Sequence, residues 1–371
     1  MNIIMFYHSL ISDWNHGNAH FLRGIVTELK SRGHNVRVYE PENGWSIQNL
    51  VEQKGEEVLK EFFQYYPGLS SRVYSPDTLE YDRVLDQADL VIVHEWNEHE
   101  LVKRLGEHRK HNTHYRLLFH DTHHRSVTDK ESMSQYDLSG YDGVLAYGNV
   151  IRDIYLQNGW TGRAWTWHEA ADVRIFHPVK GVEKKGELIW VGNWGDEERT
   201  RELHEFLLDP VKELAISAKV YGVRYSNEAL KSLKEAGIEY GDWLPNYKVP
   251  EAFAEYRLTI HIPRSPYVES LPGIPTIRPF EALACGIPLI CSPWEDAEGL
   301  FRKGEDYLAA QNGEEMKKLI KEVLNDKGLY EKLSKNGRET ILKRHTCAHR
   351  ADELITICRE LGIIKEQVQV S

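Results

Sequence analysis

The stretch MNIIMFYHSLISDWNHGNAHFLRGIVTELKSRGHNVRVYEP, residues 1–41, contains two short apolar runs separated by one helical pattern. The first run, at 2–8, is typical of a buried strand. The second, at 35–41, follows a helix predicted at 21–34 that ends near Gly33. Parallel strands need a crossover of this length, whereas a tight turn joins only antiparallel neighbours. The opening of the chain therefore predicts a parallel βαβ unit.

The same alternation continues along the chain. The further strands that apolar runs predict lie at 89–96, 115–122, 142–148, 186–194, 214–223, 258–264 and 287–293. The helical patterns after the first lie at 199–208, 227–237, 250–256, 314–325, 329–344 and 349–361. This order indicates an α/β fold of two doubly wound, Rossmann-like domains, with a ligand cleft at the carboxyl ends of their strands.

The stretch 160–179 breaks the alternation and predicts the connection between the domains. We expect an amino-terminal domain at 1–172, a second domain at 173–350 and a separate final helix at 351–371. A chain of 371 residues is long enough for two such cores.

Composition limits the classes of protein. The net charge of -11 argues against a general nucleic-acid binder. The four cysteines contain no CxxC pair and predict reduced thiols in a cytoplasmic protein. No apolar run approaches the length of a membrane span, so we expect no transmembrane segment.

The stretch PGIPTIRPFEALACGIPLICSP, residues 272–293, carries the clearest chemistry. A proline-rich loop with Gly273 leads into a helix near Thr276, and free N–H groups at a helix start attract anions. Arg278 lies close to that start and Glu281 lies deeper in the helix. A carboxylate there can accept hydrogen bonds from both hydroxyls of a ribose. The alternative is that Glu281 only pairs with Arg278, three residues earlier.

The run FEALACGIPLI at 280–290 resembles the signature of retaining GT-B glycosyltransferases of glycosyltransferase family 4. Other segments resemble the CgeB-like glycosyltransferases, named after a spore-maturation protein: SDWNHGNAHFLRG, DTHHR, TWHEAAD, GNWGDEERTREL, GDWLPN and RHTCAHR. They follow one another through nearly the whole chain. The resemblance implies a GT-B fold whose last helix crosses back to the first domain, and it implies that Glu281 binds the ribose.

One position departs from that pattern. Family 4 enzymes usually carry an acid eight residues before this glutamate, where the present chain has Gly273. The nearest carboxylate is Glu269, and the alternative is that the PGIPT loop presents backbone amides instead. Retention of the anomeric configuration therefore rests on the resemblance alone.

A nucleotide sugar needs its diphosphate neutralised. The chain has no Asp-x-Asp triplet to hold a metal, so we expect cations and amides to do this. Gly192 lets the backbone approach, and the arginine and lysine of family 4 match Asn193 and Arg199 here. We expect Arg199 to bind the phosphate, with Arg278 as the replacement charge. The alternative is that Arg199 and Arg201 pair only with neighbouring glutamates.

Aromatic residues precede the helix at 250–256. Trp243 or Tyr240 in YGDWLPN offers a face on which the nucleotide base could stack. Packing into the core is the alternative for both.

The loop after the first strand should complete the sugar site. Gly17 and Asn18 would bring main-chain N–H groups near the donor, and His16 and Asp13 are candidates for contact with the acceptor hydroxyl. The alternative for any single histidine is a structural role in a loop.

A second histidine candidate ends the strand at 115–122. His120 matches the histidine that family 4 enzymes use near the transferred sugar. Asp121 beside it would orient His16 or act as a base. The clusters HDTHH and HTCAH lack a CxxC or HExxH partner, so we expect no metal site.

These observations predict a metal-independent glycosyltransferase. It would move a sugar from a UDP-, GDP- or ADP-type donor to an acceptor hydroxyl, with retention and without a cofactor. The acceptor stays open between a polysaccharide, a protein, a lipid and a small molecule, and a nucleic acid is disfavoured by the charge. The alternatives are a non-catalytic nucleotide or glycan binder and a sugar-nucleotide epimerase of the same fold.

Overall fold

The computed structural model describes residues 1–195 and 198–364. It divides into two compact units. Unit 1 contains Met1–His168 and the chain from Cys347 onward, and unit 2 contains Glu169–Thr346. The boundaries between the units lie at 168/169 and 346/347. Both are slightly earlier in the chain than the predicted boundaries at 172/173 and 350/351. Residues 365–371 of the expected final helix lie outside the described residues.

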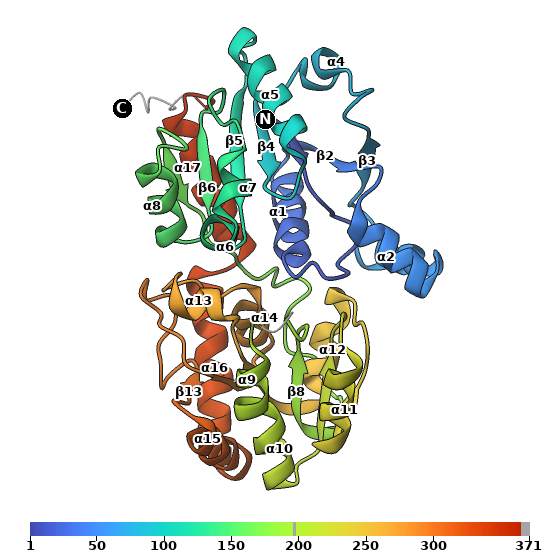
Figure 1. The fold of residues 1–371 in the computed structure, drawn as a ribbon, viewed down its shortest axis with the longest axis vertical. Helices are drawn as coiled ribbons and strands as arrows, with labels where there is room; N and C mark the ends of the chain where they lie inside the picture. Colours follow the sequence, from blue (N-terminus) through green and yellow to red (C-terminus); the bar gives the residue numbers. More distant parts are fainter. Residues whose placement is uncertain (196–197, 365–371) are drawn as a thin grey trace. The chain divides into compact units, whose positions relative to one another are not determined.

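Unit 1 contains a seven-stranded parallel sheet in the order β3-β2-β1-β4-β5-β6-β7 (Figure 1). The strands are β1 (Asn2–Phe6), β2 (Asn35–Pro41), β3 (Ser71–Tyr74), β4 (Leu90–His94), β5 (Arg116–Asp121), β6 (Gly143–Ala146) and β7 (Ala164–Thr166). β2 and β3 lie on one side of β1, and β4 to β7 lie on the other. The strand order therefore reverses between β1 and β4. This order is that of a Rossmann sheet, whose ligands bind where the strand order reverses.

The central strands are apolar because both faces of the sheet are covered. Ile4 of β1 pairs with Arg37 on one side and with Val91 on the other. Every residue of β4 is buried, and such continuous apolar runs are typical of parallel sheets between helical layers.

Two strands of unit 1 were not expected from the sequence. β3 pairs with β2, and β7 pairs with β6 within the stretch that we expected to be only a connection. Both are short, and β3 is largely exposed. Short edge strands carry little of the apolar pattern that identifies central ones.

The helices of unit 1 are α1 (Ala19–Ser31), α2 (Trp45–Lys54), α3 (Glu57–Tyr65), α4 (Tyr81–Leu85), α5 (His99–His111), α6 (Arg125–Thr128), α7 (Lys130–Ser134), α8 (Asn149–Gln157) and α17 (Cys347–Glu360). The last helix, α17, packs beside α1 (Figure 1). Trp167 donates its indole N–H to the carbonyl of Arg350 at 2.8 Å, and Arg350 donates Nε–H to the carbonyl of His168 at 2.9 Å. These bonds attach the end of the chain to the segment that leaves β7.

Unit 2 repeats the architecture with six parallel strands in the order β10-β9-β8-β11-β12-β13. They are β8 (Gly186–Val191), β9 (Ala218–Tyr221), β10 (Ile238–Tyr240), β11 (Tyr256–His261), β12 (Leu289–Cys291) and β13 (Leu308–Ala309). Here the strand order reverses between β8 and β11. The two doubly wound sheets confirm the predicted fold class.

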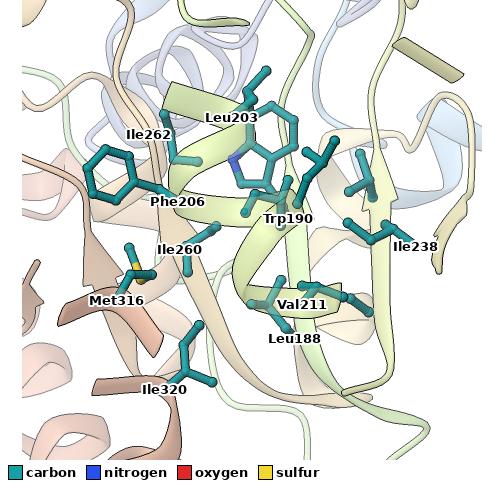
Figure 2. Packing of buried hydrophobic residues seen from close by; sticks show 14 of the residues in the cluster. Leu188, Trp190, Leu203, Phe206, Val211, Ile238, Ile260, Ile262, Met316 and Ile320 are labelled. Atoms are coloured by element: carbon teal, nitrogen blue, oxygen red, sulfur yellow. The ribbon is translucent and has the colours of Figure 1, made fainter. Parts of the chain in front are cut away.

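The helical segments of unit 2 are α9 (Thr200–Leu203), the π-helical turn η1 (His204–Leu208), α10 (Asp209–Leu214), α11 (Asn227–Glu235), the 3-10 turn η2 (Asn246–Lys248), α12 (Val249–Ala254), α13 (Ser265–Glu269), α14 (Ile277–Cys285), α15 (Gly313–Asn325) and α16 (Lys327–Arg344). Figure 2 shows how they cover the sheet: Trp190 of β8 and Ile260 of β11 pack with Phe206 of η1 and Met316 of α15. This core holds the carboxyl ends of β8 and β11 in place.

All four cysteines are buried and none forms a disulfide. Among the residues that the structure describes, no helix is both long and apolar enough to span a membrane.

Candidate functional site

The Glu281 carboxylate of α14 lies in the interior of unit 2. Its side chain is fully buried, and Oε2 accepts a hydrogen bond from Nη1 of Arg278. Asn246 of η2 donates a longer bond, 3.4 Å, to Oε1. The pair with Arg278 that the sequence offered as an alternative is thus present. It leaves open whether Glu281 also binds a ribose.

Glu169, at the start of unit 2, is a second buried acid that sequence reasoning missed. Burial, and next the charge of Glu281, raise its pKa well above the ordinary value for glutamate, while Arg278 acts in the opposite direction. Glu169 is 2% exposed. The two carboxyls are close enough for one to favour the protonated form of the other. Glu169 lies in the segment TWHEAAD. We considered this segment only as part of the resemblance to the CgeB-like glycosyltransferases.

Arg199 lies where the strand order of unit 2 reverses. Its Nη1 donates to the carbonyl of Ile262 after β11 at 2.7 Å, and its Nη2 donates to the carbonyl of Asn193 after β8. The guanidinium also covers the ring of Trp190, 5.1 Å from its centroid. These contacts hold a cation at the carboxyl ends of both central strands, where ligands of such sheets bind.

Arg199 remains positively charged in its partly buried position. Desolvation, and next the charge of Arg264, lower its pKa to about 9, so the group stays protonated at neutral pH. Arg264 itself pairs with Glu198 at 2.8 Å. Arg201, by contrast, has an 86% exposed side chain beside Glu202. The alternative in which both arginines pair only with neighbouring glutamates thus describes Arg201 and not Arg199.

The backbone around Gly192 is tightly packed. A Cβ on Gly192 would lie 2.7 Å from the ring of Trp190, and one on Gly222 would lie 2.1 Å from the carbonyl of Gly192. Asn193 accepts a bond at Oδ1 from the backbone of Val223 at 2.8 Å. Asn193 therefore joins two loops at the strand ends.

The two aromatic candidates for base stacking differ. Tyr240 donates its hydroxyl to the carbonyl of Gly222 at 2.8 Å and lies against Tyr225. Trp243 is partly exposed in the loop that follows. Both residues are half-buried, so burial alone does not choose between them.

The loop before α14 is conformationally strained. Gly273 has a φ of +94°, and a Cβ there would lie 2.9 Å from Cγ and 3.3 Å from Oε1 of Glu298. Thr276 has a φ of 59°, which is uncommon for a β-branched residue. Strained residues concentrate at ligand sites. The carboxylate beside Gly273 is Glu298, whereas Glu269, which the sequence favoured, is exposed at the end of α13.

The loop after β1 of unit 1 is held by an ion pair. Asp13 accepts from Nη1 of Arg23 at 2.8 Å, and the buried Arg23 also donates to the carbonyls of Leu10 and Ile11. Arg23 in turn covers the ring of Phe62. These contacts give Asp13 a structural role, in addition to any contact that it makes with an acceptor.

The next residues of this loop reach the end of β5. Asn18 donates from Nδ2 to Oγ1 of Thr122 at 2.7 Å and to its carbonyl at 3.1 Å. Gly17 precedes it at the start of α1. His16 is 6% exposed, and burial, together with His8, lowers its pKa well below the ordinary value.

His120 and Asp121, at the end of β5, are fully buried. His120 lies between Phe21 and Trp167, and burial lowers its pKa to about 3. Neither of its ring nitrogens has a hydrogen-bond partner within the described parts of the chain. Asp121 accepts from the hydroxyl of Tyr155 at 2.9 Å, and burial raises its pKa to about 6. Its other oxygen accepts from the backbone N–H of His123 at 2.9 Å, so the carboxylate bonds Tyr155 and His123 rather than His16, which we expected it to orient.

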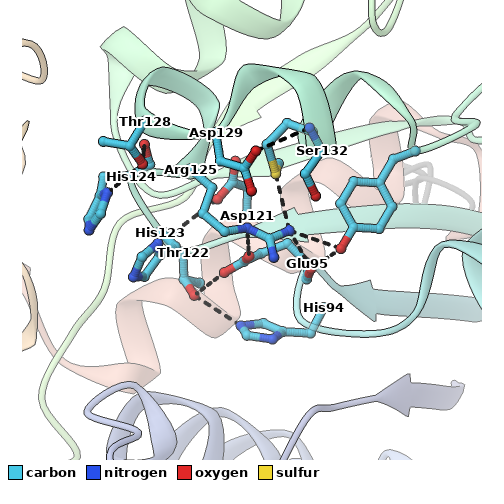
Figure 3. Close-up of polar contacts among 12 residues, drawn as sticks. His94, Glu95, Asp121, Thr122, His123, His124, Arg125, Thr128, Asp129 and Ser132 are labelled. Atoms are coloured by element: carbon cyan, nitrogen blue, oxygen red, sulfur yellow. Dashed lines mark hydrogen bonds and ion pairs between the residues drawn. The ribbon is translucent and has the colours of Figure 1, made fainter.

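A further polar group at the end of β4 was missed. His94 bonds Oγ1 of Thr122 through Nε2 at 2.9 Å, and Glu95 lies between Thr122 and Arg125 (Figure 3). The available signal was the pair His-Glu that ends the apolar run at 89–96. In parallel sheets polar residues at the carboxyl end of a strand face the ligand edge. Within the described residues, no group of three or more side chains could hold a metal ion.

Residues 199–356 match the model of a family described as glycosyl transferase-like. The chain contains a glycosyltransferase-like domain. No curated protein matches the sequence.

Solved structures share the fold over almost the whole chain. The sucrose-phosphate synthase of Thermosynechococcus elongatus has a TM-score of 0.67 at 13% identity, covering 98% of this chain and 99% of that one. An α-glucosyltransferase in complex with UDP has a TM-score of 0.66 at 13% identity, covering 97% and 100%. HepE of Anabaena, in complex with UDP and glucose, has a TM-score of 0.63 at 13% identity, covering 97% and 99%. These matches confirm the predicted GT-B fold.

Proposed function

We propose that this protein is a metal-independent GT-B glycosyltransferase that moves a sugar from a nucleoside diphosphate sugar to an acceptor hydroxyl. The observation that carries the proposal is Arg199, a partly buried cation bonded to main-chain carbonyls at both strand ends of the ligand edge. A leaving diphosphate develops negative charge, and a fixed cation in a water-poor site stabilises it strongly.

Two more arginines support this assignment. The charges of Arg264 and Arg278 both lower the pKa of Arg199, so the three positive groups lie near one another. Glu198 and Glu281 pair with Arg264 and Arg278, and a diphosphate would add the negative charge that faces Arg199. Amides of the loop from Gly273 to Thr276 and the start of α14 add donors of the kind that bind phosphate.

The ribose would bind to Glu281, with Asn246 and Glu169 close to it. A charged carboxylate and a protonated one together offer both acceptors and a donor to vicinal hydroxyls. The base would stack on Trp243. UDP is our first choice of nucleotide, because two of the similar structures hold UDP.

Unit 1 would provide the acceptor and sugar contacts. The candidates are His16, Gly17, Asn18, His120 and Asp121, with Asp13 holding the loop. Neutral imidazoles suit hydroxyl groups because each ring has one donor and one acceptor nitrogen.

We further propose that the chain belongs with the CgeB-like enzymes and retains the anomeric configuration. In the front-face route, the leaving phosphate oxygen takes the proton of the acceptor, so no protein nucleophile is required. The resemblance of the segment around Glu281 supports this, and Glu298 would provide the carboxylate that Gly273 lacks.

The acceptor is proposed as a polysaccharide, protein, lipid or small molecule. The net charge of -11 disfavours a nucleic acid, although one similar glucosyltransferase was solved with DNA. Four buried cysteines without disulfides support a cytoplasmic location.

Calorimetry with UDP, GDP and ADP, in buffer with a chelator, tests the nucleotide site. We expect UDP to bind without a divalent metal, and binding that requires Mg²⁺ or Mn²⁺ would contradict the cation cluster. Hydrolysis of nucleotide sugars without an acceptor then separates the alternatives: a transferase releases sugar slowly, a binder releases none, and an epimerase interconverts the donors.

A further inference from the structure

A chain of hydrogen bonds connects His94 to Glu95 through the hydroxyl of Thr122 (Figure 3). His94 Nε2 lies 2.9 Å from Oγ1 of Thr122, and Oε1 of Glu95 lies 3.4 Å from the same oxygen. All three side chains are buried, with exposures of 0%, 0% and 2% for His94, Glu95 and Thr122. The three residues come from the ends of β4 and β5.

The hydroxyl of Thr122 cannot donate to both neighbours, because it has one hydrogen. Asn18 occupies one of its lone pairs by donating from Nδ2 at 2.7 Å. The second bond from the same amide nitrogen, to the carbonyl of Thr122, confirms that this atom is the donor end of the amide. One lone pair and one hydrogen of Oγ1 remain for His94 and Glu95.

Two arrangements satisfy all three groups. With Glu95 ionised, Thr122 donates to Oε1 and accepts from Nε2–H of His94, which leaves a lone pair on Nδ1. With Glu95 protonated, Glu95 donates to Thr122, Thr122 donates to Nε2, and the hydrogen of the neutral ring lies on Nδ1. The protonation state of Glu95 therefore determines the tautomer of His94.

The other nitrogen of His94, Nδ1, belongs to a ring that lies among other histidines. Nδ1 is buried and has no hydrogen-bond partner in the described residues, and the same holds for Nε2 of His16. The ring of His94 lies 5.6 Å from that of His120 and 6.1 Å from that of His16. Buried polar atoms need partners, so these nitrogens indicate a place for a ligand with hydroxyl groups.

We propose that Glu95, acting through Thr122, sets the tautomer of His94 so that Nδ1 accepts a hydrogen bond from a sugar hydroxyl. His94 would be a ligand-binding residue, and Thr122 and Glu95 positioning residues. The sugar as ligand rests on the proposed function, whereas the tautomer control does not.

The surroundings favour an uncharged His94 ring and a Glu95 carboxyl group that can gain or lose a proton. Burial, and next the charges of His120, His16, His8 and Arg125, lower the pKa of His94 well below its ordinary value. Burial and Asp121 raise the pKa of Glu95, while Arg125 and two bonds from Thr122 act in the opposite direction. The charged or titratable groups around the chain of bonds include Tyr7, His8, His16, His120, Asp121, Arg125, Tyr136 and Tyr155.

The pH should affect sugar binding through the tautomer of His94. As the pH falls, Glu95 gains a proton, the His94 hydrogen moves to Nδ1, and the acceptor for the hydroxyl becomes a donor. Sugar binding that depends on this acceptor is lost at acidic pH and present at higher pH.

Nitrogen-15 spectra of histidine-labelled protein without ligand test the tautomer control. His94 is assigned by comparison with H94Q. Across a pH titration, we expect a neutral ring whose hydrogen moves from Nδ1 to Nε2 as the pH rises and Glu95 loses its proton. T122S should keep this exchange, while T122V and E95Q should abolish it. An unchanged tautomer in the wild type, the same exchange in T122V, or an imidazolium above about pH 5 would overturn the proposal.

UDP-glucose tests the hydroxyl contact. Added at high pH, it should shift the Nδ1 signal of His94 in the wild type and T122S, and its KM should rise about tenfold in T122V with a smaller change in kcat. Binding of UDP-glucose that leaves Nδ1 unchanged would contradict the sugar contact. Absence of any UDP-glucose binding would instead contradict the proposed function, since the spectra without ligand still decide the tautomer control.

Discussion

Arg278 donates a hydrogen bond to the carboxylate of Glu281, one turn further along α14. Glu281 is buried, whereas the side chain of Arg278 is 27% exposed. The pair holds a charged carboxylate inside unit 2 near a second acid, Glu169. A buried charge needs compensation, and one arginine here lies beside two buried acids, Glu281 and Glu169. Such an arrangement is unusual for a purely structural ion pair.

The substitution Glu281→Gln tests the ribose contact. Loss of charge-assisted hydrogen bonds of about 1.5 to 3 kcal/mol should weaken UDP binding about ten- to a hundredfold, measured by calorimetry. The effect on stability should be small, since the amide oxygen of glutamine can still accept from Arg278 and Asn246.

A nucleotide without ribose hydroxyls provides the control. The 2′,3′-dideoxy analogue of UDP should bind the wild type weakly and lose nothing more in Glu281→Gln. If the variant unfolds while the wild type binds the analogue normally, Glu281 only holds its helix.

Arg199→Lys should weaken UDP binding at least tenfold. A lysine has one compact ammonium group and cannot donate to the carbonyls of Asn193 and Ile262 while also facing a phosphate. Arg201→Lys is the matched control, because the same change is made two residues away on an exposed side chain. Equal effects of the two substitutions would argue against the phosphate role.

Gly273→Ala should destabilise the protein more than Gly55→Ala. Both glycines have positive φ, +94° and +79°, but nothing lies within 4 Å of a Cβ at Gly55. We expect Gly55→Ala to cost about 1 kcal/mol from the backbone alone, with a further contribution at Gly273 from the clash with Glu298. Urea denaturation measures both.

The double variant Gly273→Ala with Glu298→Ala isolates that clash. It should recover part of the stability that Gly273→Ala loses, beyond the effect of Glu298→Ala alone. Strict additivity would show that Glu298 does not restrict this position.

Acid should unfold the protein through its buried histidines. Burial lowers the pKa of His8 to about 4 and those of His120 and His261 to about 3, below the ordinary histidine value of 6.5. The unfolded chain then binds more protons, so stability is full above about pH 6.5 and falls as the pH drops toward these values. Each group contributes a slope of up to about 1.4 kcal/mol per pH unit. Denaturant titrations at several pH values should show the fall begin near pH 6.5, and a flat stability down to pH 4 would contradict it.

The α/β class was predictable because the central strands are apolar on both faces. β1, β4 and β8 coincide with continuous apolar runs, and these runs alternate with helical patterns. β3 and β7 were missed because short edge strands lack this pattern. The boundary between the units was placed within a few residues, since the alternation stops there.

The site was only partly predictable. Sequence identified Arg199, Glu281 and His120 from their places near strand ends or a helix start, together with the resemblance to family 4 enzymes. It did not identify Glu298, because nothing local separates it from the other glutamates of an acidic chain, and it overlooked Glu95 although this residue ends an apolar run. Their roles arise from neighbours far apart in sequence.

The sequence by itself thus determined the two doubly wound sheets, the strand ends that face the ligand edge and the proline-rich glycine loop before α14. These follow from local periodicity and from the order of strands and helices. Only the tertiary structure decided that Arg199 bonds two strand ends, that Glu298 approaches Gly273 and that Thr122 connects His94 to Glu95. Side-chain hydrogen bonds depend on distances of a few tenths of an ångström between residues distant in the chain. No local pattern encodes such distances, because they are fixed by packing.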